Sequence, residues 1–118
     1  MAYDEELADR IRAEVAGERG VTEMRMFGGL AFLIGGHLAV AASGQGGLML
    51  RCDPDDTDEL LGEPGAQELE MRGKGMRGWL RVEASAVADD GALRTWVARG
   101  TAYARSLPPK GSAASGGS

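Results

Sequence analysis

The sequence predicts a two-layer α+β domain in which helices pack on one face of an antiparallel sheet, with the element order α-β-β-β-β-α-β-β-α. Three features predict it: a helical apolar stripe near the start, a glycine-punctuated series of short apolar runs, and a second helical stripe near the end. The length of 118 residues suits one domain that can bury a core without disulfides. We therefore expect a single domain over residues 1–110 and a flexible Gly/Ser tail over residues 111–118.

The first helix is predicted from an apolar residue at every fourth position. Leu7, Ile11 and Val15 form one stripe along the helix. Asp4 suits the N-cap position, and the acidic residues that follow it suit the positive end of the helix dipole. Gly17 supplies a signal for the end of the helix.

The next part of the chain predicts four antiparallel strands, because short apolar runs alternate with glycine turns. The runs are Met24–Phe27, Leu30–Ile34, Leu38–Ala42 and Leu48–Leu50. The Gly35-Gly36 pair suits a two-residue hairpin turn, in which positive φ angles are required.

A corner of this meander contains Met26, Phe27, Gly28 and Gly29. The two glycines suit a bulge or a sharp bend between two strands. The methionines of the meander are expected to fill gaps in the core, and they are Met24, Met26 and Met49.

The second half of the chain predicts a short helix and a further pair of strands. Asp53 and Pro54 form a strong helix start, and the helix is expected to end near Gly62. The two strands are expected over residues 67–71 and 78–83, joined by a basic loop over residues 72–77.

The last helix is predicted to begin at a cap formed by Asp89 or Asp90 and to end before Pro108-Pro109. Trp96 lies on its apolar stripe and is expected to anchor the helix to the sheet. With all helices on one face, the other face of the sheet stays open. We expect an open face to meet a partner, which can be a second copy of the chain.

The charge distribution is uneven, and its basic part is the strongest candidate for a binding site. The formal net charge is −5, which disfavours a nonspecific nucleic-acid binder. Residues 72–81 nevertheless contain four cations and no acid, and they flank a tryptophan; the candidate partner-binding residues are Arg72, Lys74, Arg77, Trp79 and Arg81. These residues can be a solvated hairpin, a site for an acidic protein, or a site for nucleic-acid phosphates.

Catalytic, cofactor and metal sites are not predicted. Cys52 and His37 are the single cysteine and the single histidine, so neither an internal disulfide nor a Cys/His zinc site is expected. Cys52 is expected to be a passive, partly buried residue, and His37 to lie at a turn. The chain contains no Walker A loop, and the carboxylates over residues 53–59 do not fit the calcium-binding frame of an EF-hand.

The cytoplasm is the expected location, with no membrane partner. The chain contains no apolar run near the ~20 residues that a bilayer-spanning helix requires. The N-terminal segment is acidic, unlike a signal peptide. A single cysteine fits a reducing compartment.

Several segments together resemble the N-terminal domain of the TfoX/Sxy family, over residues 4–107. They are Arg25–Phe32 with Leu38–Val40, Met76–Val82, and Leu93–Val97 with Ala102 and Ala104. The resemblance implies a fold like that of type III secretion chaperones. It also implies a non-enzymatic role, since the name-giving members are transcriptional coactivators that regulate natural competence. Those members carry a second, C-terminal domain thought to reach DNA, whereas this chain is expected to be a stand-alone N-terminal domain.

The expected function is therefore a non-enzymatic protein-interaction module of the regulatory, competence-related kind. It is expected to act through the basic loop and the open sheet face, as a homodimer or with an acidic protein partner. The alternative is a nucleic-acid-binding module that uses the same loop. A small-ligand binder or an enzyme is the least expected class, and no cofactor is predicted.

Overall fold

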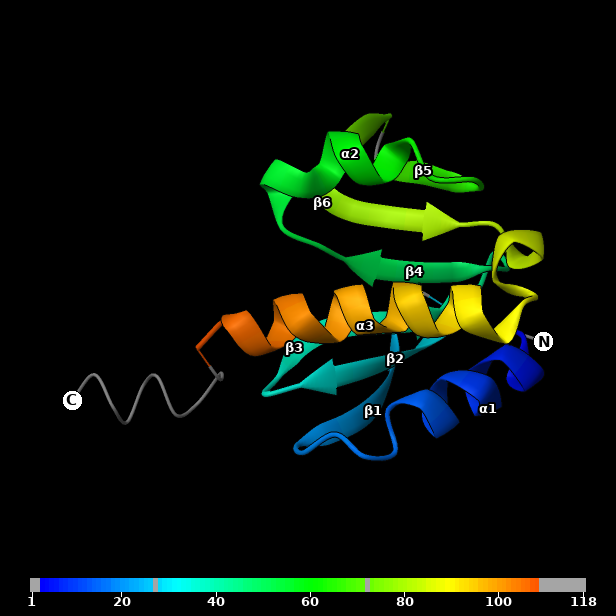
Figure 1. Ribbon diagram of the computed structural model, residues 1–118, viewed down its shortest axis with the longest axis vertical. Helices are drawn as coiled ribbons and strands as arrows, with labels where there is room; N and C mark the ends of the chain where they lie inside the picture. Colours follow the sequence, from blue (N-terminus) through cyan, green and yellow to red (C-terminus); the bar gives the residue numbers. More distant parts are fainter. Residues whose placement is uncertain (1–2, 27, 72, 109–118) are drawn as a thin grey trace.

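The computed structural model describes residues 3–26, 28–71 and 73–108, and it confirms the predicted fold class and element order (Figure 1). Six strands form one antiparallel sheet in the order β1-β2-β3-β4-β6-β5. The elements are α1 (Glu5–Glu14), β1 (Val21–Met26), β2 (Gly29–Ile34), β3 (His37–Ala42), β4 (Leu48–Arg51), the 3-10 turn η1 (Pro54–Asp56), α2 (Thr57–Leu61), β5 (Ala66–Met71), β6 (Lys74–Val82), η2 (Ala84–Val87) and α3 (Asp90–Ser106). The expected tail over residues 111–118 lies outside the described residues.

The two long helices begin at aspartate caps. The Asp4 carboxylate accepts a hydrogen bond from the Leu7 amide at 3.2 Å, as the sequence predicts for α1. At α3, the Asp89 carboxylate accepts from the Ala92 amide at 2.9 Å, so Asp89 rather than Asp90 is the cap. Each cap satisfies an amide that has no partner within its helix.

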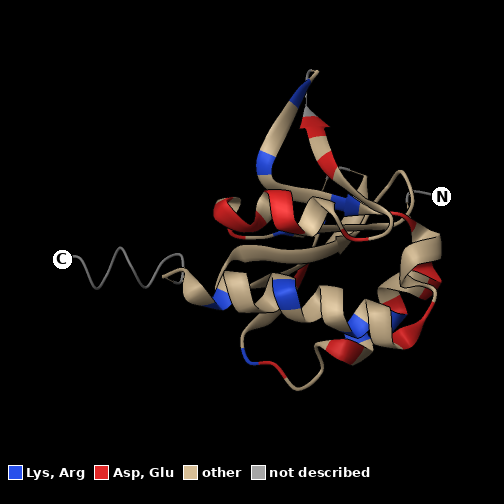
Figure 2. Cartoon of the chain, turned by 45° about the horizontal axis from the view of Figure 1, so that its top comes forward, with Lys and Arg blue, Asp and Glu red and all other residues tan. Residues whose placement is uncertain are grey.

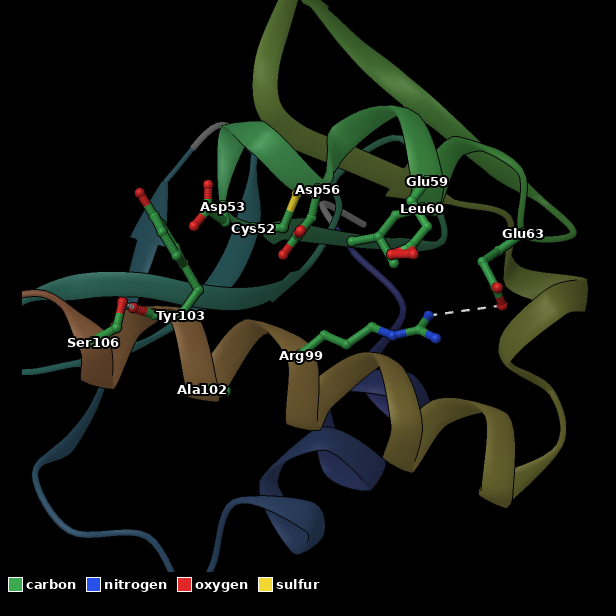
Figure 3. Close-up of a pocket in the computed structure, with 10 residues that line it drawn as sticks. All are labelled: Cys52, Asp53, Asp56, Glu59, Leu60, Glu63, Arg99, Ala102, Tyr103 and Ser106. Carbon is green, nitrogen blue, oxygen red and sulfur yellow. Dashed lines mark hydrogen bonds and ion pairs between the residues drawn. The ribbon is translucent and has the colours of Figure 1, made fainter.

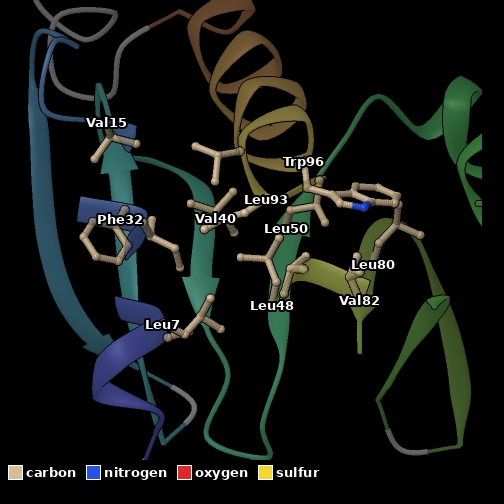
Figure 4. Packing of buried hydrophobic residues seen from close by; sticks show 14 of the residues in the cluster. Leu7, Val15, Phe32, Val40, Leu48, Leu50, Leu80, Val82, Leu93 and Trp96 are labelled. Atoms are coloured by element: carbon tan, nitrogen blue, oxygen red, sulfur yellow. The ribbon is translucent and has the colours of Figure 1, made fainter. Parts of the chain in front are cut away.

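The core lies between the helices and one face of the sheet (Figure 4). Phe32 of β2 belongs to this cluster and is 1% exposed. Leu50 of β4 and Leu80 of β6 lie opposite each other in the sheet and are both fully buried. Trp96 of α3 is 4% exposed and packs into the same cluster.

Two strand boundaries differ from the prediction. β1 begins at Val21 rather than Met24, and Met24 itself is exposed instead of lying in the core. The apolar pattern that predicts a strand is absent from the start of β1, because Thr22 and Glu23 are polar. An edge strand can carry such residues, since both of its faces can be exposed. β6 begins at Lys74, so most of the expected loop over residues 72–77 is strand.

The glycine corner before β2 is explained by close packing of the backbone. Gly28 has a φ of +74°, and a Cβ at Gly29 would overlap the carbonyl oxygen of Ala42 and lie 2.9 Å from the amide nitrogen of Gly44. Only glycine fits such an approach without displacing a neighbouring strand. Phe27 lies outside the described residues.

No membrane-crossing helix is found in residues 3–26, 28–71 and 73–108, because no helix there combines sufficient length with a sufficiently apolar composition.

Candidate interaction surfaces

The face of the sheet opposite the helices carries a second, smaller apolar cluster, which we call the open face. Its buried residues are Ala31, Leu33, Leu38, Ala41 and Met49, and its partly buried residues are Met26, Leu69 and Trp79. They come from all six strands, which the alternation of side chains along each strand brings to one side. Leu33 and Leu38 lie opposite each other, as do Ala41 and Met49, so neighbouring side chains shield one another without a helix above them.

The internal strands of this face carry charges of one sign, and the carboxylates of Glu68 and Glu70 on the edge strand β5 line a hollow together with Arg81. The four internal strands β2, β3, β4 and β6 contain no aspartate or glutamate, although the whole chain has a net charge of −5. Arg81 of β6 lies opposite Met49, and Arg51 of β4 lies opposite Trp79. Arg81 therefore adds a guanidinium to the open face, whereas the Arg51 side chain also reaches Tyr103 of α3 at the border of the helix layer.

Each of these two arginines is held in place by neutral groups. Arg81 donates hydrogen bonds to the side-chain oxygen of Gln45 at 3.2 Å and to the carbonyl oxygen of Gly46 at 3.1 Å. The Arg51 guanidinium lies 5.3 Å from the ring centroid of Trp79 and 5.5 Å from that of Tyr103. Such contacts orient a positive charge without neutralising it.

Arg77 has a different environment from Arg81, although both belong to the predicted basic loop. It donates to a carboxylate oxygen of Asp58 in α2 at 2.8 Å, and this hydrogen bond lowers the pKa of Asp58 below its usual value. Since α2 packs against the core, Arg77 faces the helix layer and not the open face. Gly78, between Arg77 and Trp79, has a φ of +84° and breaks the regular alternation of side chains.

The remaining residues of the predicted loop lie at the end of the β5–β6 hairpin. Lys74 is exposed there, and Arg72 lies outside the described residues. Figure 2 shows acidic residues on β5 beside the cations of β6. The structure thus brings Trp79 and Arg81 together on the open face and separates Arg77 from them.

A pocket of about 600 Å³ lies between α2 and α3, and sequence reasoning did not predict it (Figure 3). It is lined by Cys52, Asp53, Asp56, Glu59, Leu60, Glu63, Arg99, Ala102, Tyr103 and Ser106. Its two walls come from residues 52–63 and 99–106, which no local pattern connects. Across the pocket, the Arg99 guanidinium lies 3.8 Å from the Glu63 carboxylate.

The lining of this pocket places the Cys52 thiol near the carboxylates of Asp53 and Asp56. Burial raises the pKa of the Cys52 thiol, so little thiolate forms at neutral pH. The imidazole of His37 is engaged elsewhere, with Nε2 at 2.6 Å from the carbonyl oxygen of Pro108. Within the part of the chain that the structure describes, no three His, Cys, Asp or Glu side chains are grouped as a metal would require.

We expect the Cys52 thiol to react slowly with a disulfide reagent such as DTNB at neutral pH while the domain is folded. The side chain is 3% exposed, and its pKa is raised by burial and by the nearby carboxylates of Asp56 and Asp53. The time course of thiol release measures this, with glutathione as the reference for a free thiol. In urea the reaction should approach the rate of the reference; an equally fast reaction of the folded domain would contradict the assignment of Cys52 as buried and inert.

Comparison with known proteins identifies one similarity. A family model described as the TfoX N-terminal domain matches residues 13–104. The matched segment includes all six strands, and with them the whole open face. No curated protein and no solved structure matches the chain significantly.

Proposed function

The chain belongs to the TfoX N-terminal domain family, and from this premise we propose that it is a protein-interaction module of a regulatory, competence-related kind. The open face binds an acidic protein segment that also carries apolar side chains. The module acts in the cytoplasm, through binding and not through catalysis. The resemblance of its sequence to competence regulators supports the regulatory part of the proposal.

The observation that carries this proposal is the positive charge of arginine beside an apolar cluster that no helix covers. Leu33, Leu38 and Met49 lie on the side of the sheet that the helices leave free. Their own exposed fractions are only 5–8%, so the apolar area that a partner can contact comes from the partly buried Met26, Leu69 and Trp79 around them. Arg51 and Arg81 lie beside it, and they favour a partner with carboxylates, since complementary charge selects and steers a partner.

Nucleic acid is the alternative partner for the same cations. The sequence places Arg77 among the cations that could bind phosphates. In the structure, however, its guanidinium already forms an ion pair with the Asp58 carboxylate. Glu68 lies 4.0 Å from Arg77 as well. These carboxylates lower the local positive potential that a phosphate backbone requires.

An affinity capture with charge-reversal variants tests the proposal. The tagged chain is incubated with a host-cell lysate, with and without nuclease, and the bound proteins are identified. We expect Arg81→Glu to reduce capture by about tenfold or more, because a like charge then faces the acidic partner. Arg94→Glu is the matched control, since Arg94 is an exposed residue of α3 on the helix side.

The outcomes separate the two partner classes. Capture that survives nuclease and is lost only in Arg81→Glu supports an acidic protein at the open face. Capture that collapses on nuclease treatment supports the nucleic-acid alternative. Equal capture by wild type, Arg81→Glu and Arg94→Glu contradicts any role for the open face, provided that circular dichroism shows all three to be folded.

A further inference from the structure

The strand β1 ends the sheet, and its outer edge is exposed. Thr22, Glu23, Met24 and Arg25 are all exposed, and Met24 is 51% accessible, as the one large exposed apolar residue among those described. On its inner side β1 pairs with β2 at six consecutive positions, without a shift in register. In Figure 1 it forms the lower border of the sheet. The edge is therefore straight and apolar in part, and its outward backbone groups are available to another strand.

The other edge of the sheet, β5, differs from β1 in the regularity of its pairing and in its charge, since it carries the two acidic residues Glu68 and Glu70. β5 pairs with β6 through a register shift between Glu68 and Glu70. Irregular pairing and repeated like charge are devices that protect an edge strand from pairing with other chains. β1 has no register shift, and its two charges, Glu23 and Arg25, are of opposite sign, so it lacks both the irregular pairing and the like charges of β5.

We propose that β1 is a dimer interface, at which it pairs antiparallel with β1 of a second copy around a two-fold axis at Met24. This inference goes beyond the proposed function, because it assigns a second surface and its occupant. Pairing through one strand is a small interface, so we expect a dissociation constant in the micromolar range. Symmetry of this kind closes at the dimer and does not propagate into a fibre.

The charges of β1 select this register. In antiparallel pairing only alternate residues turn their backbone groups outward, so the axis must pass through a residue and not between two residues. An axis at Glu23 would oppose two carboxylates, and an axis at Arg25 would oppose two guanidinium groups. An axis at Met24 instead places Glu23 of each copy opposite Arg25 of the other. Opposite charges that face each other across strands stabilise the pair, and like charges destabilise it.

The surroundings of these two residues fit the proposed pairing. Arg12 of α1 donates to both carboxylate oxygens of Glu23, at 2.7 and 2.8 Å, so the carboxylate is held over the strand and Arg25 of the second copy would be its second cation. Arg25 lies on the same side of β1, two residues further on. It takes part in none of the ion pairs found within residues 3–26, 28–71 and 73–108. Its guanidinium is thus free to meet Glu23 of the second copy.

The dimer would also extend the open face. Met24 and Met26 lie on the side of β1 that faces away from the core, since their register partners are Ala31 and Gly29 and Ala31 belongs to the open-face cluster. At the axis the two Met24 side chains meet, and Thr22 of each copy lies opposite Met26 of the other. The two open faces then form one continuous surface across the dimer, with both helix layers on the opposite side.

The test is sedimentation velocity on two single variants and their mixture. In a dimer of the Glu23→Lys variant, Lys at position 23 of each copy faces Arg25 of the other copy. In a dimer of the Arg25→Glu variant, Glu at position 25 of each copy faces Glu23 of the other copy. Each variant alone should dimerise about tenfold or more weakly than wild type. Mixed in equal amounts, they should form a heterodimer again, because every facing pair is then of opposite charge. Glu70→Lys on the β5 edge is the matched control and should leave dimerisation unchanged.

Arg25→Glu leaves the Arg12–Glu23 contact intact, so its thermal unfolding shows whether loss of dimer reflects loss of fold. A wild type that stays monomeric throughout the micromolar range would overturn the proposal. So would dimers that persist in both single variants, species larger than a dimer, or a mixture that does not re-associate. Capture of a partner by the monomeric Arg25→Glu variant would show that the open face works independently, so the two proposals can fail separately.

Discussion

Replacing Phe32 with alanine is expected to lower the free energy of unfolding by about 3–5 kcal/mol, the range found when a buried phenylalanine is truncated. The side chain is 1% exposed and lies between β2 and the helix layer, opposite Val40 of β3. Its removal leaves a cavity that the sheet backbone cannot close. It also removes the ring over which the Arg12 guanidinium lies, 5.9 Å from the ring centroid. The loss is a large share of the total for a domain, which is ~5–15 kcal/mol.

Urea denaturation followed by circular dichroism measures this loss, with unfolding midpoints compared at constant slope. Met24→Ala is the matched control, because it truncates a large apolar side chain that is 51% exposed. In dilute protein its effect should stay within ~0.5 kcal/mol. Equal destabilisation by the two substitutions would contradict the placement of Phe32 in the buried core.

The sequence predicted the fold class because its signals were local and redundant. The stripe of Leu7, Ile11 and Val15 fixed the first helix, and glycine turns separated the strands from Leu30 onward. The start of β1 was missed because Thr22 and Glu23 are polar, as an edge strand permits. No core face is buried there to impose an apolar pattern.

The candidate site could be predicted only in part. Arg77 and Arg81 lie four residues apart and were expected to act together, yet they face opposite sides of the sheet. The cause is Gly78, whose left-handed backbone conformation shifts the alternation of side chains between them. Sequence identifies that glycine but not its φ angle. The pocket between α2 and α3 was beyond prediction for another reason, since its walls meet only through the tertiary fold.

The four internal strands, which contain no aspartate or glutamate, contribute side chains to both sides of the sheet. On the helix side their side chains build the core, and on the other side they build the open face. These four strands carry no carboxylate on either side, although they do carry arginine. The acidic residues of the chain instead occupy the helices, the loops and the two edge strands. The internal strands thus carry only basic charges, with Arg81 of β6 beside the acidic edge strand β5, and their positive charge supports an acidic partner there.

Gly100 of α3 provides the second large effect, and its expected sign is unusual. In the exposed part of a helix, replacing glycine with alanine stabilises by about 1 kcal/mol. At Gly100 a Cβ would overlap the carbonyl oxygen of Ala39 and lie 2.7 Å from a methyl carbon of Val40. The glycine therefore lets α3 pack directly on β3, where the helix anchors to the sheet. We expect Gly100→Ala to destabilise the domain by about 1–3 kcal/mol, and Gly100→Val to do so by more.

The comparison with Ala98→Gly makes this prediction decisive. Ala98 is an exposed residue of the same helix, and its change to glycine should cost about 1 kcal/mol through helix propensity alone. If propensity governed both positions, Gly100→Ala would raise the midpoint of thermal unfolding while Ala98→Gly lowered it. If close packing of α3 on β3 governs position 100, Gly100→Ala and Ala98→Gly should both lower the midpoint of thermal unfolding. A raised midpoint in Gly100→Ala would mean that α3 lies further from the sheet than the structure places it.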